Sequence, residues 1–355
     1  MLIVSPSGYS LMKVGSIHEE CLKEEASFKW IESEKAGMDL GDTATRRWVK
    51  WTLAAGMVWQ QWRAVEVETA ERGRVQSTWI LIGALDWSRL ILREDGRSGG
   101  ADHLAEPWAV PLQEARLSTF LAADKNVSQV DDATTDTTEA FLSGQISDMQ
   151  GRLNLTNLVD NGNVQTLALR QFTRLFERLG LPLQELSQLT DALRRAQATT
   201  GTDSTNAPLL PPTMSQLGWL GVPSSTIAIL SPHITILPVR TPVNLNTAQL
   251  DVLWAALDGI DLASAQKLIA SRESRHFKLI SDATSLLGSN TVLDDTQVSV
   301  ASRFFEVRGR LRLGDSIVDE RSLVRKDASN FVVTLWRERG VFDRDPATAA
   351  AQAPR

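Results

Sequence analysis

The spacing of apolar and polar residues predicts one unusually long helix between Leu53 and Asp95. No proline interrupts this stretch, and opposite charges stand at helical spacing, as in Glu68 and Arg72. Its later half carries apolar residues every three or four positions, which is typical of a helix that packs against a core. These residues are Ile80, Leu81, Ala84, Leu85, Trp87, Ile91 and Leu92. The alternative is two ordinary helices that meet at Gly73.

The last third of the chain changes to the period of a β-strand. Residues 303–313 place apolar side chains on one face and charged side chains on the other. Gly314 and Asp315 form a predicted hairpin turn, after which residues 317–326 return as a second strand. Residues 331–336 are expected to add a third strand, so this region predicts an antiparallel sheet.

The charged face of the first of these strands admits two interpretations. A row of basic side chains can serve as a platform for RNA. The predicted register, however, places Asp319 opposite Arg310 and brings Glu320 close by, and opposite charges in this position attract. A solvated face with paired charges is therefore favoured for the basic residues Arg303, Arg308, Arg310 and Arg312.

The middle of the chain predicts two strands followed by helices. Residues 141–159 are expected to form two strands joined by a tight turn at Gly151. Residues 164–198 have helical periodicity, with Gly180 ending one helix and Pro182 opening the next. The first of these helices packs through Leu167, Phe172, Leu175, Phe176 and Leu179.

Residues 243–290 predict two helices joined by a tight turn, an arrangement that resembles the helix-hairpin-helix unit. The first helix is expected to be capped by Asn246 or Thr247. DNA-binding versions bring the backbone N–H groups of a glycine-rich turn to a phosphate, whereas this turn carries Asp258 and Asp261. Two carboxylates would repel a phosphate by about 1 kcal/mol or more. A structural or protein-binding role is favoured, because the basic residues Lys267, Arg272, Arg275 and Lys278 are outnumbered by Asp251, Asp258, Asp261, Glu273 and Asp282.

The composition is that of a globular protein and not of a disordered or fibrous one. The chain has 355 residues, of which 43% are hydrophobic and 23% charged, so two or three domains are expected. Its formal net charge of −6 argues against general nucleic-acid binding. Cys21 is the single cysteine, which excludes an internal disulfide framework.

The sequence shows none of the common catalytic patterns. We find no Ser-His-Asp set, nucleophile elbow, Walker lysine or zinc signature, and we therefore expect no enzymatic activity. The histidines lie far apart and lack metal-binding spacing, so surface or packing roles are expected for them. They are His18, His103, His233 and His276.

Residues 1–51 differ from the rest of the chain. They are polar and form no continuous apolar face, so we predict a poorly ordered leader. Charged residues interrupt every apolar run before Leu53, which is unlike a secretory signal. No window reaches the roughly 18 apolar residues that a membrane span requires.

Five segments, taken in order, resemble the GspK family, the large minor pseudopilins of bacterial type II secretion systems. The resemblance covers about residues 53–340, and the order and combination of the segments are more specific than the helix-hairpin-helix pattern alone. The segments are LAAGMVWQQWRAVEVE (53–68), ALDWSRLILRED (84–95), SDMQGRLNLTNLV (147–159), ITILPVRTPVNLNTA (234–248) and SRFFEVRGRLRL (302–313).

The resemblance implies an α+β pseudopilin fold, in which a long N-terminal helix lies on an antiparallel sheet. It also implies an inserted all-helical domain that contains a helix-hairpin-helix or SAM-like unit. The expected parts are an atypical, disordered leader at 1–51, the long helix at 53–95, the first part of the core at 96–160, the inserted domain at 161–300 with the helix-hairpin-helix at 243–290, the C-terminal sheet at 301–342 and a disordered tail at 343–355.

The resemblance also implies a non-catalytic function. In the family this subunit joins other minor pseudopilins and the major pseudopilin at the tip of the pseudopilus, where it starts assembly and limits its length. The expected location is the inner membrane, facing the periplasm, and no nucleic acid is expected as a partner. Partner-binding residues are expected on the long helix at Met57, Trp59, Trp62 and Val65. The alternative function is a helix-hairpin-helix DNA-binding protein.

The chain departs from the family pattern in two places. Many relatives carry acidic stretches associated with calcium in the helical domain, whereas the corresponding LTDALRRAQATT offers only Asp191, so we expect no cofactor. Relatives also begin with a basic leader and about twenty apolar residues, whereas here the family pattern starts abruptly at Leu53. We therefore expect that residues 1–51 arise from a frameshift or a misassigned start, which sequencing upstream of the Leu53 codon tests.

Overall fold

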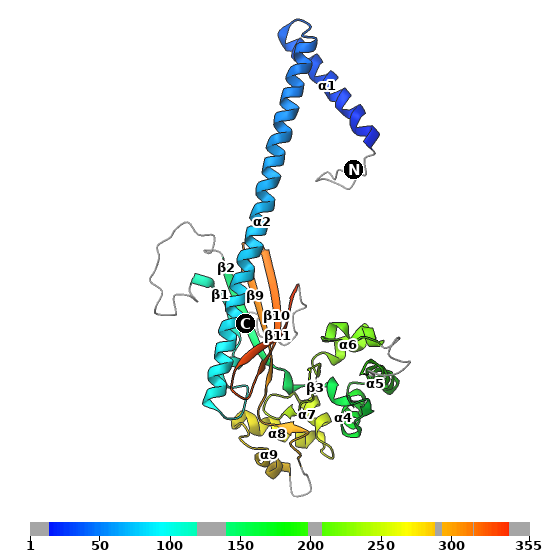
Figure 1. Cartoon of the computed structure of the whole chain (residues 1–355), viewed down its shortest axis with the longest axis vertical. Helices are drawn as coiled ribbons and strands as arrows, with labels where there is room; N and C mark the ends of the chain where they lie inside the picture. The colour runs from blue at the N-terminus through cyan, green and yellow to red at the C-terminus, as the bar shows by residue number, and fades with distance from the viewer. Residues whose placement is uncertain (1–13, 119–139, 198–207, 288–292, 315, 341–355) are drawn as a thin grey trace. The chain divides into compact units, whose positions relative to one another are not determined.

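The computed structural model describes residues 14–118, 140–197, 208–287, 293–314 and 316–340 (Figure 1). The chain divides into two compact units, a first unit of Met1–Gln76 and a second unit of Ser77–Arg355. The predicted tail at 343–355, most of the connector before residue 140 and Asp315 of the predicted hairpin turn lie outside the described residues.

The first unit contains helix α1 (Val14–Ala36) and the beginning of helix α2 (Asp42–Ser98). The connection between them turns at Gly37 and Gly41, whose φ angles of 66° and 47° favour glycine. Helix α2 thus starts well before the predicted Leu53 and passes through Gly73 without a break. Among the described helices, none combines the length and the apolar character needed to cross a membrane.

The helices before residue 52 differ from the poorly ordered leader that we predicted. The prediction relied on the missing apolar face, but a helix also forms where Glu and Lys are frequent, and no Gly or Pro lies between Ser16 and Ala36. In addition, Asp42 lies in the first turn of α2, where a carboxylate interacts favourably with the helix dipole. Local helix propensity therefore decided the structure where amphipathic periodicity is absent.

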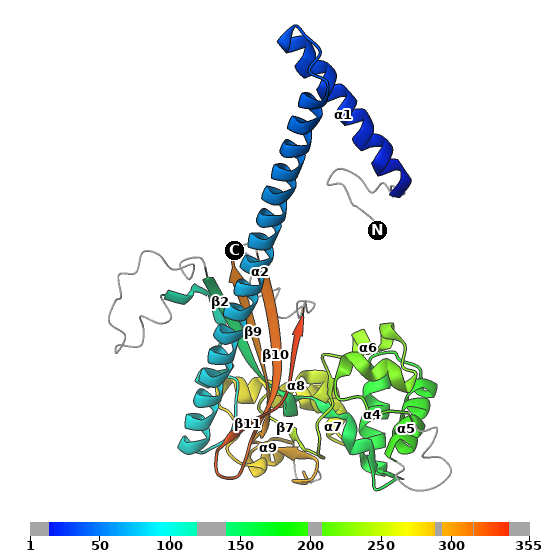
Figure 2. The ribbon, with the colours of Figure 1, turned by 45° about the horizontal axis from the view of Figure 1, so that its top comes forward.

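The second unit is built on a five-stranded antiparallel sheet with strand order β1-β2-β9-β10-β11 (Figure 1). The later half of α2 lies across one face of this sheet (Figure 2). Leu81, Leu85 and Leu92 of α2 are buried there, as the apolar stripe predicts. Gly309 allows this close approach, because a Cβ atom at this position would lie 3.2 Å from Leu81 Cδ2. The strands are β1 (Leu112–Arg116), β2 (Ala140–Asp148), β9 (Phe304–Leu313), β10 (Ser316–Lys326) and β11 (Val332–Gly340).

The predicted hairpin near the C-terminus is confirmed. Strands β9 and β10 pair antiparallel with Arg310 opposite Asp319, and Gly314 has a φ of 56° at the turn. Strand β11 pairs with β10 as expected but continues to Gly340, beyond the predicted end at Trp336. The alternating apolar positions therefore predicted both the strands and their register.

The strand, tight turn and second strand predicted at residues 141–159 are present in that order, but the second strand is short and the two strands do not pair with each other. Strand β2 pairs with β1 and β9, and the residues after it form a 3-10 turn at Met149–Gly151. The next strand, β3 (Leu153–Asn154), pairs parallel with β6 (Ile234–Thr235). Apolar periodicity identified the strand, but it did not identify partners that are distant in the sequence.

The described residues between β2 and β9 (149–197, 208–287 and 293–303) form a mostly helical region with its own apolar core. The predicted break between two helices at Gly180 and Pro182 is confirmed, since Gly180 has a φ of 67°. Phe172, Leu175 and Phe176 are fully buried in this core. The helices are α4 (Thr166–Arg178), α5 (Leu183–Gln197), α6 (Ser224–Leu230), α7 (Leu250–Ala256), α8 (Leu262–Ser274) and α9 (Ile280–Leu287).

Candidate functional site

The predicted partner-binding residues lie on α2 in the first unit, where every side chain from Trp51 to Arg72 is exposed. Trp59 and Trp62 are 55% and 59% exposed. At 3.6 residues per turn, Trp59, Trp62 and Val65 share one side of the helix, which we call the tryptophan face. Met57 is also exposed, but the same geometry puts it on the opposite side. The structure thus groups three of the four predicted residues.

The tryptophan face is unusual for a soluble surface. Large apolar side chains of monomeric proteins are normally exposed singly, whereas contiguous patches mark interaction sites. The guanidinium of Arg63 lies 4.8 Å from the ring centroid of Trp59 and leaves the rest of the patch open. Such a helix surface can bind a second helix or an apolar groove through its indole rings.

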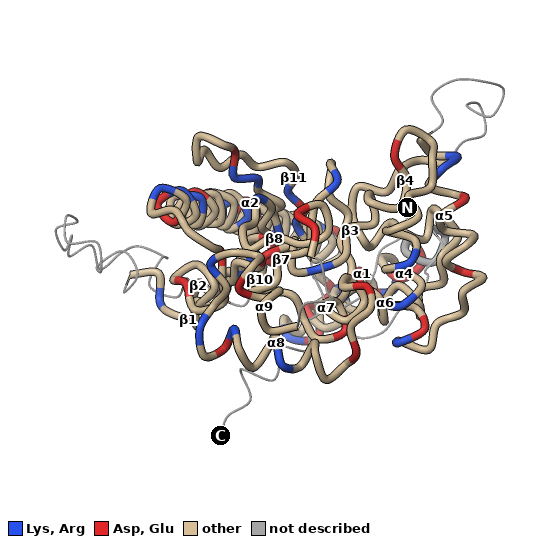
Figure 3. The backbone as a smooth tube through the Cα atoms, turned by 90° about the horizontal axis from the view of Figure 1, so that it is seen from below, with Lys and Arg blue, Asp and Glu red and all other residues tan. Residues whose placement is uncertain are grey.

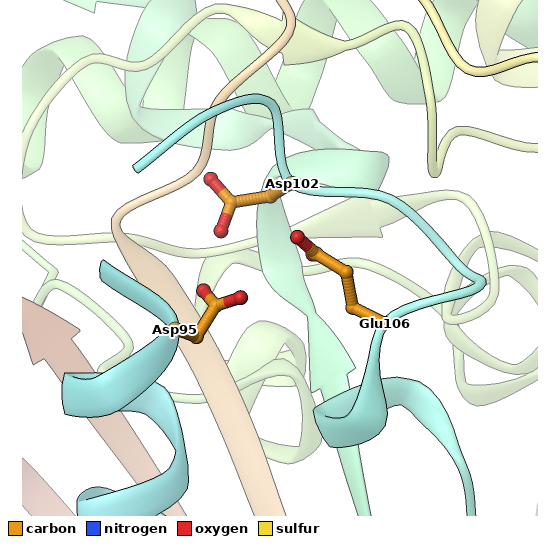
Figure 4. A group of neighbouring side chains, drawn as sticks. All are labelled: Asp95, Asp102 and Glu106. Carbon is orange, nitrogen blue, oxygen red and sulfur yellow. The ribbon is translucent and has the colours of Figure 1, made fainter. Parts of the chain in front are cut away.

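An acidic cluster lies where α2 ends. One carboxylate oxygen from each of Asp95, Asp102 and Glu106 lies within 4.8 Å of the other two, and the side chains point toward a common centre (Figure 4). Lys326 Nζ of β10 lies 2.8 Å from Asp102 Oδ1 and 3.3 Å from Asp95 Oδ2. Glu106 accepts a hydrogen bond of 2.6 Å from Trp108 Nε1.

The ammonium group of Lys326 provides the counter-charge of this cluster. Burial raises the pKa of Asp95 and of Asp102, and Lys326 opposes both shifts. Burial also disfavours the charged form of Lys326, but the two aspartates outweigh it and raise its pKa. The arrangement is an ion network that ties α2 to β10 through Asp95, Asp102 and Lys326. The expectation of no cofactor stays a prediction.

A buried polar junction connects the sheet with the helical region, and sequence reasoning missed it. Asp148, at the end of β2, is its centre. Its carboxylate accepts hydrogen bonds from Gln150 N (2.8 Å), Asn244 Nδ2 (3.0 Å), Thr247 Oγ1 (2.6 Å) and Ser302 Oγ (2.6 Å). Burial raises the pKa of Asp148, although the Ser302 and Thr247 hydroxyl groups lower it.

The junction joins both ends of the helical region to the sheet. Asp102 Oδ2 accepts from Ser302 N at 2.6 Å, just before β9 begins. Gln150 Oε1 accepts a hydrogen bond from Arg303 N at 2.8 Å. This bond joins the segment that enters the helical region after β2 to the segment that leaves it before β9. Gly151 is required there, because a Cβ atom would lie 2.9 Å from Thr247 Oγ1.

The predicted helix caps at Asn246 and Thr247 are wrong. Helix α7 begins at Leu250 after Gln249, which makes no capping hydrogen bond with its side chain. Asn246 instead bonds the backbone of Phe277, and Thr247 donates to Asp148. These polar residues resemble caps in the sequence, but their partners lie in distant segments.

The turn between α7 and α8 engages its carboxylates within the protein. Asp258 forms ion pairs with Arg170 at 3.2 Å and Arg174 at 3.5 Å. Asp261 Oδ1 accepts from Ser264 N at 2.8 Å and caps α8. This geometry offers nothing that favours a phosphate ligand.

The arginines of β9 are paired, as predicted, but the face is not fully solvated, because Glu306 and Asp319 are buried. Arg310 makes a two-pronged ion pair with Asp319, with N–O distances of 2.6 and 2.8 Å. Arg308 pairs with Glu306, and Arg312 pairs with Glu114. Across the described residues, basic and acidic positions are interspersed along the backbone (Figure 3).

Comparison with known proteins points to one family. Models of the family "Type II secretion system (T2SS), protein K" match residues 151–239 and 243–301. Type II secretion system protein K of Pseudomonas aeruginosa is 28% identical over 290 residues, covering 74% of this chain and 80% of the relative.

A solved structure has the same fold. The GspK-GspI-GspJ complex from enterotoxigenic Escherichia coli contains a chain that matches with a TM-score of 0.55 and 17% identity. The match covers 77% of this chain and 99% of that chain. The family models, the curated relative and this fold agree, and all of them make the chain similar to the GspK family of type II secretion system minor pseudopilins.

Proposed function

We propose that this chain works at the tip of a type II secretion pseudopilus, where it helps to start assembly and limits its length. The proposed action is packing rather than catalysis. The tryptophan face of α2 carries the proposal, because it exposes indole rings that a neighbouring subunit can cover. The proposed location is the inner membrane, with the second unit facing the periplasm.

The proposed partners are the chain's counterparts of GspI and GspJ, together with the major pseudopilin. GspI and GspJ accompany GspK in the complex from enterotoxigenic Escherichia coli, which supports this choice. Within the proposal, α7, α8 and their turn are a helix-hairpin-helix unit used for packing, since Asp258 and Asp261 are engaged by the protein itself. Nucleic acid is not a proposed partner.

Tryptophan side chains that become fully buried at an interface contribute about 2 kcal/mol or more each, which is roughly 30-fold in affinity. Because helix residues Trp59, Trp62 and Val65 lie side by side, one partner surface can cover all of them. Met57 faces the other side, so we assign it to a different neighbour in the fibre.

Size-exclusion chromatography with light scattering tests the proposal. The full chain is mixed with purified counterparts of GspI and GspJ from the same genome, and a ternary complex is expected. Separate elution of the three proteins, even when each is injected at about ten times the concentration first used, would contradict the proposed function. A parallel titration of labelled duplex DNA examines the alternative, and salt-sensitive binding there would favour it.

A further inference from the structure

Two histidines that are far apart in the sequence stack on each other in the second unit. His103 lies in the loop after α2, and His276 lies between α8 and α9. Their ring centroids are 3.8 Å apart and their planes differ by 12°. The stack is therefore a direct contact between the helical region and the loop after α2, which carries Asp102 and Glu106 of the acidic cluster.

The hydrogen bonds of His103 indicate a neutral ring. Its Nδ1 accepts from Ala105 N at 3.2 Å, so this nitrogen carries no proton. The remaining proton is on Nε2, which lies 3.9 Å from Glu106 Oε1. A second proton on His103 would replace the acceptor at Nδ1 by a donor and break the bond to Ala105.

The charges around His103 are mainly acidic. Burial lowers its pKa, while the nearby carboxylates of Asp95 and Asp102 oppose the shift. Lys326 donates hydrogen bonds to both carboxylates, and its positive charge partly cancels their attraction for a proton on His103. A proton on His103 alone therefore gives up the bond to Ala105 but is attracted by these carboxylates.

The charges around His276 are mainly basic. Burial lowers its pKa, and the neighbouring His103, Lys278 and Arg275 lower it further, against the single opposing carboxylate of Glu106. Arg272 and Glu273 line the same hollow and nearly balance each other. A proton on both rings would place like charges face to face, next to further cations.

We propose that the stacked pair of His103 and His276 is a pH-responsive contact between the loop after α2 and the helical region. The contact is closed while at most one ring is protonated, and it opens when both rings are charged. The opening is local, since the polar junction holds the helical region through separate bonds centred on Asp148. Acidification therefore loosens this loop without unfolding the chain.

Proton NMR of the imidazole rings tests the coupling. Like charges this close should separate the two protonation steps of the full chain by about one pH unit. In His276→Gln the remaining His103 is expected to titrate higher than the second step of the wild-type pair, and the same holds for His276 in His103→Gln. Unchanged titration of the remaining ring would overturn the proposal.

Hydrogen exchange measures the opening itself. The reporter is the Glu106 amide, which donates to His103 O at 3.2 Å within the loop, because this backbone bond does not involve the imidazole ring. Exchange rates are corrected for the intrinsic effect of pH. The protection of this amide is expected to fall about tenfold from pH 7 to pH 5 in the wild-type chain and to stay constant in His276→Gln. The control His233→Gln removes a histidine elsewhere and should keep the wild-type pH dependence. Equal protection at both pH values in the wild-type chain would overturn the proposal, whatever the variants do.

Discussion

Replacing Asp148 by alanine should weaken the attachment of the helical region to the sheet. The carboxylate is 8% exposed and is the shared acceptor of the polar junction. In Asp148→Ala, Asn244 Nδ2 keeps acceptors in Asp102 O at 3.1 Å and Ser302 Oγ at 2.9 Å. The Gln150 amide and the Thr247 and Ser302 hydroxyl groups lose the acceptor that they now share.

The magnitude follows from these lost bonds. A buried donor left without an acceptor costs about 1–3 kcal/mol, and relief from burying the carboxylate offsets part of the sum. We therefore expect Asp148→Ala to lower the free energy of unfolding of the second unit by about 3–5 kcal/mol. In Asp148→Asn the amide oxygen can still face Thr247 and Ser302, while its NH₂ group confronts Gln150 N. The expected loss is then about 1–2 kcal/mol.

Urea unfolding followed by circular dichroism provides the measurement, with the free energies extrapolated to water. Asp86→Ala is the matched control, because Asp86 is an exposed aspartate of α2 whose pair with Arg89 lies at the surface. This control should change the free energy of unfolding by less than about 1 kcal/mol. A value for Asp148→Ala that equals the control would refute the assigned role of the junction.

Three further changes test other contacts of the second unit. Gly151→Ala should lower the free energy of unfolding by about 1–3 kcal/mol, because the new Cβ atom would contact Thr247. Its control is Gly83→Ala, which has nothing within 4 Å of the new Cβ atom and should stabilise α2 slightly in thermal melts. Lys326→Met should cost about 3 kcal/mol or more, because Asp95 and Asp102 lose their buried counter-charge, and an unchanged melting temperature would contradict this. The lowered pKa values of His103 and His276 mean that the unfolded chain binds protons first as the pH falls below about 6.5, so they reduce stability on acidification. The double variant His103→Gln/His276→Gln should lose less stability between pH 7 and pH 5 than the wild type, and an equal loss in both would argue against this linkage.

The sequence predicted those parts of the fold that depend on local pattern. Alternating apolar positions identified β9 and β10 together with the pairing of Arg310 and Asp319, because the side-chain period fixes register once the turn is known. Gly180 and Pro182 separated α4 from α5 for equally local reasons. The apolar stripe of α2 likewise identified the residues that meet the sheet.

Contacts between distant segments escaped prediction. Asp148, Asn244 and Ser302 are polar residues that resemble ordinary turn residues, and only the folded chain brings them together in a buried junction. The stack of His103 on His276 escaped for the same reason, although both were expected to pack or face solvent. The start of α2 was placed too late, because polar helices lack the periodicity on which the prediction relied. The partner-binding assignment came from family resemblance, and it stays a prediction.

The dissociation constant between this chain and its GspI and GspJ counterparts tests the central claim most directly. Isothermal titration calorimetry compares the wild-type chain with Trp59→Ala/Trp62→Ala and with the control Gln60→Ala, whose exposed glutamine lies on the side opposite the tryptophan face. The account predicts at least about 100-fold weaker binding for the tryptophan variant and wild-type affinity for the glutamine control. Wild-type affinity in the tryptophan variant would contradict the claim that this face of α2 joins the chain to the pseudopilus tip.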